Sequence, residues 1–252
     1  MANNEKKLEV LDVIPILVEN LKKISAINLI VHPANFNWRQ KNTLNTDQLR
    51  TLDSGLIQYK RPMIEIPRYE VLTNYRKVVN EIVEDYKNII PNTLVSFCSK
   101  VITGKRKEMH LPTMNYHPIL DGITDEEELK NSIIKLLKLI VRWDGYLLKT
   151  DRYWHYYGEY LLSQEEFYHW LGLHSNSCFS VSPRYIGQSL RDGYTPTRQT
   201  STALYKMTIP YVSEKIQKNA ENISVWDYQE IEIIDFRKFK YNAVVHGYEV
   251  KE

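Results

Sequence analysis

One stretch, residues 146–198, constrains the fold of this chain more than any other, because local signals fix the order of its elements. Residues 146–157 are rich in Tyr and Trp, which predicts a strand that ends at Gly158. Ser163 and Glu166 have the spacing of a capping box, so a short aromatic helix is expected over 164–173.

The second half of this stretch predicts another helix and a strand. Pro183 is favoured at the first position of a helix, and Gly193 is favoured just past the end of one. Residues 197–200, with the sequence TRQT, then predict a strand. The stretch therefore reads strand, helix, helix, strand.

Amphipathic helices and short strands are expected in the rest of the chain. The predicted helices cover 5–24 (with Pro15 inside it), 69–90 and 124–142, with a possible short helix over 46–57; the predicted strands cover 27–31, 93–102, 108–116 and two segments of 224–250 around a bend at 235–240. This order favours an α+β fold with a mainly antiparallel sheet backed by helices. We expect residues 1–68 to form an N-terminal helical appendage and residues 69–252 to form the α+β core.

The net charge, the cysteine spacing and the lack of a long apolar run bear on which classes of function are expected. The net charge of +2 gives no strong overall field for nucleic acid, so any basic surface must be local. Cys98 and Cys178 have no metal-ligand spacing and are expected to be reduced thiols. With no leader-like N-terminus and no apolar run of membrane length, we expect a cytoplasmic protein without a membrane partner.

Four motifs in order resemble a known family. They are TDRYWH (150–155), WLG (170–172), SPRYIG (182–187) and TRQT (197–200). Their order and spacing over residues 109–212 are similar to those of the archaeo-eukaryotic primase and primase-polymerase superfamily, in a divergent bacterial primase-like branch. This resemblance implies a primase-like catalytic core whose sheet has RNA-recognition-motif character, with a cleft on its open face. It also implies that His155 contacts the phosphates of an incoming nucleotide.

The resemblance also assigns the metal-binding acids to definite positions. By it, the acidic pair falls at Asn115 and His117, which period two places on one face of a strand, and the third acid falls at Ser182. None of these residues is an acid, although paired magnesium ions need carboxylate ligands. The catalytic positions Asn115, His117, His155 and Ser182 are therefore expected to be degenerate. They are also expected to converge on one face of one sheet.

A site that has lost its metal-binding acids can still bind phosphate through other side chains. The resemblance and the residue types together suggest His155, Arg152, Arg184 and Arg198 as phosphate ligands, with Arg198 favoured because arginine binds phosphate in a bidentate way. The alternation of Trp154, Tyr156 and Tyr157 would give one face to the core and leave the other able to stack a base. A zinc site built from His110, His117 and His155 is disfavoured, because three histidines at such spacings are common.

Three functions remain open from the sequence. The first is a catalytically degenerate primase-like protein that binds nucleotide or single-stranded nucleic acid, or serves as a subunit of a larger assembly, such as a mobile-element or antiphage (antiviral) defence complex. The second is an active nucleotidyltransferase with displaced acids at Asp121 or Asp151, which would use Mg or Mn. The third is a purely structural subunit. No cofactor is expected in the first or third case, and protein partners are expected in both.

Overall fold

The computed structural model describes residues 8–33, 62–88, 93–116, 126–140, 144–150, 153–175, 181–201, 209–216, 239–242 and 247–250. Contacts within the chain divide it into two units, residues 1–218 and 219–252. The larger unit is α+β, and all strand pairs described in it are antiparallel. The predicted α+β class with antiparallel pairing is confirmed.

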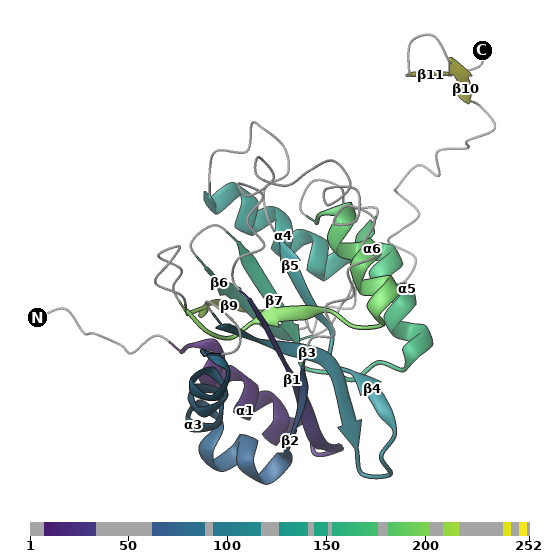
Figure 1. The fold of residues 1–252 in the computed structure, drawn as a ribbon. Coiled ribbons are helices and arrows are strands. Elements are labelled where there is room, and N and C mark those ends of the chain that lie inside the picture. Colours follow the sequence, from purple (N-terminus) through teal and green to yellow (C-terminus); the bar gives the residue numbers. More distant parts are fainter. Residues whose placement is uncertain are drawn as a thin grey trace, which may run out of the picture. The chain divides into compact units, whose positions relative to one another are not determined.

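The first sheet is built around a long central strand. Its strands follow the order β2 (Met63–Pro67), β1 (Ile24–Pro33), β3 (Thr93–Thr103) and β4 (Glu108–His110). A further strand, β8 (Pro196–Arg198), pairs with β3 beyond the end of β4. Two helices, α1 (Val10–Asn20) and α3 (Arg68–Tyr86), lie together beside this sheet (Figure 1). They bury the apolar face of the sheet in one hydrophobic core.

The predicted boundary at residue 68 does not separate two units. Strand β1 comes from the segment predicted to be a helical appendage, yet it pairs with β3 along its whole length. The alternating side chains of Ile27, Leu29 and Val31 are buried in the same core as the helices. A sequence pattern shows such a strand but not its partner, which lies far away along the chain. The possible helix over 46–57 lies outside the described residues.

The second sheet carries the aromatic stretch. Its strands follow the order β5 (Thr113–Tyr116), β7 (Trp154–Gly158), β6 (Gly145–Lys149) and β9 (Tyr211–Ile216). One face packs against α4 (Glu126–Ile140), α5 (Gln164–Ser175) and α6 (Pro183–Asp192) in a second core (Figure 1). The other face contributes Tyr146, Leu148 and Tyr157 to the first core.

Two predicted strands are each divided in the structure. The strand predicted over 146–157 is a hairpin, because Thr150 turns the chain: its N–H donates to the carbonyl of Tyr153 at 2.8 Å and its hydroxyl accepts from the N–H of Tyr153 at 3.0 Å. The strand predicted over 108–116 breaks at Pro112, which has no N–H to continue a ladder. The chain passes there from the first sheet into the second.

In the aromatic stretch the predicted start of α5 and both predicted ends of α6 are confirmed, while α5 runs on to Ser175 instead of ending at residue 173. The N–H of Ser163 donates to Oε2 of Glu166 at 2.6 Å, and the N–H of Glu166 donates to Oγ of Ser163 at 3.3 Å. Helix α6 begins at Pro183, and Gly193 follows it with a φ of 73°, in the left-handed region that glycine adopts without strain.

Three predicted helices are present with shorter bounds, as α1, α3 and α4. Pro15 lies inside α1, and α3 has a non-helical residue at Asn74. In the part of the chain that the structure describes, no helix is both long enough and apolar enough to cross a bilayer.

The second unit contains an antiparallel pair, β10 (Phe239–Asn242) and β11 (Gly247–Val250). Its cross-strand pairs are Phe239 with Val250 and Tyr241 with Tyr248. The bend predicted over 235–240 is therefore wrong at residues 239 and 240, which belong to a strand.

A bulge in β3 connects the two sheets. Ile27 lies opposite Val101 while Asn28 lies opposite Cys98, so two residues of β3 have no partner on β1. One of them, the fully buried Ser99, forms its hydrogen bonds with Thr195 and Leu111 instead of with β1. Its N–H donates to the Thr195 carbonyl at 3.0 Å, its carbonyl accepts from Leu111 N–H at 2.8 Å, and its Oγ accepts from Thr195 N–H at 2.9 Å.

Replacing Ser99 with Ala should destabilise the fold, because the buried N–H of Thr195 would lose its acceptor. We expect a loss of about 1–3 kcal/mol in the free energy of unfolding, measured by urea denaturation. Ser25→Ala is the matched control, since the exposed Ser25 hydroxyl donates to the Ile102 carbonyl of the same sheet. It should cost less than about 0.5 kcal/mol. Equal losses in the two variants would contradict the role given to Ser99.

Candidate functional site

The candidate site begins with a direct cross-strand pair. In the antiparallel ladder of β5 and β7, Asn115 lies opposite His155 and Thr113 lies opposite Tyr157. Residues directly opposite in such a ladder point to the same face of the sheet. Asn115 and His155 therefore share a face, as the family resemblance implies.

Strand β8 brings Arg198 to this face. Nδ2 of Asn115 donates to the carbonyl of Pro196 at 3.2 Å, and the hydroxyls of Thr113 and Thr195 are 2.7 Å apart. The half-buried Arg198 has its Nη1 anchored on the carbonyl of Thr200 at 2.9 Å. The site thus combines two strands of the second sheet with an edge strand of the first.

His155 is a buried, neutral imidazole. Its side chain is 5% exposed. Burial first, and the positive charge of Arg198 second, lower the pKa of His155 to about 3. Its Nδ1 atom is buried and has no hydrogen-bond partner among the described residues. At neutral pH it can offer a ligand a hydrogen bond but no charge.

Asn115 is held in a way that a carboxylate could not reproduce. Its amide N–H group donates to the Pro196 carbonyl, an acceptor. An aspartate in the same position would set an oxygen against that carbonyl oxygen. The amide oxygen of Asn115, like Nδ1 of His155, is buried without a partner in the described part of the chain. The local structure therefore favours an uncharged amide at this position.

The other predicted site residues are only partly placed. Ser182 is the half-buried N-cap residue of α6, with no capping bond from its side chain, and Arg184 lies in the first turn of that helix. Helix α6 contacts β8 through the hydroxyl of Tyr185, which donates to the Pro196 carbonyl at 3.1 Å. His117, Asp121, Asp151 and Arg152 lie outside the described residues. The convergence of His117 and Ser182 on this face stays a prediction.

The aromatic residues of β7 serve the core. Trp154, Tyr156 and Tyr157 are all buried, so neither face of β7 presents an aromatic ring to solvent. These three rings pack in the cores and do not offer a solvent-facing surface for a base. His110 is also buried, stacks on Phe167 with ring centroids 4.0 Å apart, and contacts Gln164.

Metal and thiol chemistry each require particular donor side chains. Among the residues that the structure describes, no group of three or more His, Cys, Asp or Glu side chains is placed to hold a metal ion. Cys98 is buried, and burial raises the pKa of its thiol to about 12, which makes it a poor nucleophile.

Gln199 is a residue that motif reasoning gave no role. Its fully buried amide accepts from the hydroxyl of Tyr75 at 3.1 Å and donates to the hydroxyl of Tyr157 at 2.8 Å. It therefore links α3 to β7 directly behind Arg198. Tyr75 and Gln199 are 124 residues apart, so no local pattern in the sequence indicates this contact.

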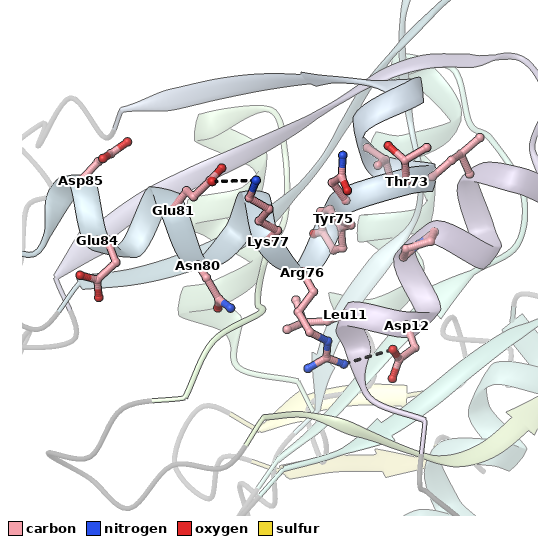
Figure 2. Close-up of a pocket in the computed structure, with 14 residues that line it drawn as sticks. Leu11, Asp12, Thr73, Tyr75, Arg76, Lys77, Asn80, Glu81, Glu84 and Asp85 are labelled. Atoms are coloured by element: carbon pink, nitrogen blue, oxygen red, sulfur yellow. Dashed lines mark hydrogen bonds and ion pairs between the residues drawn. The ribbon is translucent and has the colours of Figure 1, made fainter.

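A separate hollow of about 670 Å³ lies along α1 and α3 (Figure 2). Arg76 crosses it and pairs with Glu9 at 2.7 Å and with Asp12 at 3.1 Å. None of the predicted site residues lines it.

Acid should unfold the protein partly through His155. Its pKa is about 3 when folded and about 6.5 in an unfolded chain. The unfolded state therefore binds more protons below that upper value, and stability present above it is lost as the pH falls. His155→Gln should reduce the slope of unfolding free energy against pH by up to about 1.4 kcal/mol per pH unit below about pH 6.

The exposed His169 of α5 provides the control for this experiment. Because His169 is exposed, His169→Gln controls for the general effect of replacing a histidine with glutamine. An identical slope in the parent and in His155→Gln would contradict the buried, neutral state of His155.

Comparison with known proteins identifies the family. A family model described as archaeo-eukaryotic primase 1D-like (AEP-like) matches residues 78–211, which is more than half of the chain. The match extends from within α3 to the first residue of β9 and includes Asn115, His155, Ser182 and Arg198. No curated protein and no solved structure matches the chain. The antiparallel α+β fold agrees with this match, and the match shows that this chain is a primase-like protein of the archaeo-eukaryotic primase 1D-like family.

Proposed function

We propose that this primase-like protein binds the phosphate groups of a nucleotide or of single-stranded nucleic acid at Arg198 and His155, without metal-dependent nucleotidyl transfer at that site. The observation that carries the proposal is the hydrogen bond from the Asn115 amide to the Pro196 carbonyl. It makes position 115, where the family resemblance expects a metal-binding acid, a structural link between β5 and β8.

Electrostatics supports phosphate binding over metal binding. Magnesium needs charged oxygen ligands, and the amide of Asn115 contributes no charge. The same absence of charge removes repulsion between this position and a phosphate. Arg198 supplies a positive charge on this face, and contact with the Thr200 carbonyl orients its guanidinium group. Neutral His155 can add one further hydrogen bond.

The burial of His155 favours a second candidate, a structural subunit whose phosphate site is vestigial. Both candidates are compatible with a place in a larger assembly, such as a mobile-element or antiphage defence complex with protein partners in the cytoplasm. The binding measurement below distinguishes them.

We expect no nucleotide incorporation by the purified chain with Mg or Mn, and Asn115→Asp should not create it. This variant should instead lose about 1–3 kcal/mol of unfolding free energy, because a carboxylate oxygen would face the Pro196 carbonyl in place of an amide donor, leaving the Tyr185 hydroxyl as its donor among the described residues. Asn80→Asp, on the exposed face of α3, is the control and should be nearly neutral. Robust incorporation by the parent that Asp121→Ala or Asp151→Ala abolishes would overturn the proposal.

Binding of a fluorescent nucleoside triphosphate or of single-stranded oligonucleotide should weaken as salt is added. A contact with a charged group contributes about 1.5–3 kcal/mol, so Arg198→Ala should weaken binding roughly ten-fold or more. His155→Ala should weaken it in the same direction. Fluorescence anisotropy measures both effects.

Arg191→Ala is the matched arginine control. Arg191 is exposed at the end of α6 and pairs with Asp192 at 2.8 Å, so its removal should leave binding unchanged. If the parent binds neither ligand, or if Arg198→Ala and His155→Ala both bind as the parent does, the structural-subunit candidate stands.

A further inference from the structure

Helix α3 borders two surface hollows of opposite charge. The larger one, of about 670 Å³, runs between α1 and α3 and is lined by four carboxylates and two cationic side chains. Figure 2 shows Glu81, Glu84 and Asp85 spaced along α3, in the half of the helix that follows Arg76. This hollow is therefore acidic.

The smaller hollow lies at the N-terminal end of α3 and is basic. It has a volume of about 490 Å³, and Lys22, Lys23 and Arg68 line it with no carboxylate among its lining residues. Arg68 is anchored by backbone carbonyls between the end of α1 and the start of β1, including those of Leu21 at 3.3 Å and Ile24 at 3.1 Å. The two lysines are exposed to solvent.

Leu72 forms the wall shared by the two hollows, since it lines both. Its side chain is 40% exposed, and that of Tyr69, three residues earlier on the same face of α3, is 66% exposed. An exposed apolar pair flanked by an acidic and a basic hollow has the composition of an interface centre with a charged rim.

We propose that this α3 surface, defined by Tyr69, Leu72 and the two hollows, binds a second copy of this chain in a twofold dimer. A twofold axis beside Leu72 would place the basic hollow of each copy against the acidic hollow of the other. The surface is then complementary to itself, as a closed symmetric interface requires. The two α3 helices would run antiparallel, with the leucines in contact near the axis.

The ion pairs already on α3 do not oppose this arrangement. Lys77 and Glu81 are 3.6 Å apart, and both side chains are more than half exposed. Exposed pairs of this kind contribute only about 0–1 kcal/mol. Glu81 can therefore take a new partner across an interface at little cost.

Sedimentation of the full chain over a wide range of concentration should show a reversible monomer–dimer equilibrium. Leu72→Arg would put two like charges at the axis and should weaken dimerisation at least about ten-fold. Because Leu72 is exposed, the folded structure should persist, which circular dichroism and urea denaturation would verify.

Reversing the charge of each hollow in turn tests whether the two hollows face each other in the dimer. Lys22→Glu with Lys23→Glu would make both hollows acidic, and Glu84→Lys with Asp85→Lys would make the larger one basic. Each double variant alone should be monomeric, while an equimolar mixture of the two should form heterodimers. Lys107→Glu with Lys215→Glu, which changes the net charge equally at exposed positions elsewhere, should dimerise like the parent.

Several results would overturn the proposal. These are a parent that stays monomeric at every concentration, a dimer that is insensitive to Leu72→Arg, and a mixture of charge variants that stays monomeric. Binding of single-stranded nucleic acid to the basic hollow of a monomeric parent would also reject a second copy as the occupant.

Discussion

The hydrogen bonds of Ser99 hold the two sheets together, and the candidate site depends on them. By bulging away from β1, Ser99 frees its backbone and hydroxyl groups for Thr195 and Leu111. Thr195 leads directly into β8, and Leu111 leads into β5 through Pro112. One residue thus fixes both connections. As a result, Arg198 of the first sheet lies near the cross-strand pair of Asn115 and His155 in the second sheet.

Among the described site residues, Arg198 is charged, and Asn115, His155 and Ser182 are neutral. A buried carboxylate would have to be paired or bound to metal to be tolerated, and residues 115 and 182 are Asn and Ser. Burial keeps His155 neutral, and Arg198 disfavours its protonation further. Position 115 contributes a hydrogen-bond donor to a carbonyl, and the positive charge sits on a half-buried side chain.

The sequence predicted those features that depend on neighbouring residues. The capping bonds of Ser163 and Glu166 and the left-handed Gly193 follow from short spacings. The shared face of Asn115 and His155, which come from different strands, is instead implied by the family resemblance. The features that the sequence did not predict depend on contacts with residues far away along the chain, or on local hydrogen bonds that interrupt a strand. Strand β1 finds its place only against β3, Gln199 acquires its role only beside Tyr75, and the hydrogen bonds of Thr150 turn the chain within an apparently continuous strand.

The contact between Ser99 and Thr195 spans 96 residues of sequence, and this separation bears on biosynthesis. While the chain emerges from the ribosome, β3 can pair with β1 early, but the edge that later receives β8 has no partner until residue 198 has been made. An unpaired strand edge is a template for pairing with other chains. Until β8 has been made, the nascent chain therefore carries an open edge on β3 at which another chain could pair.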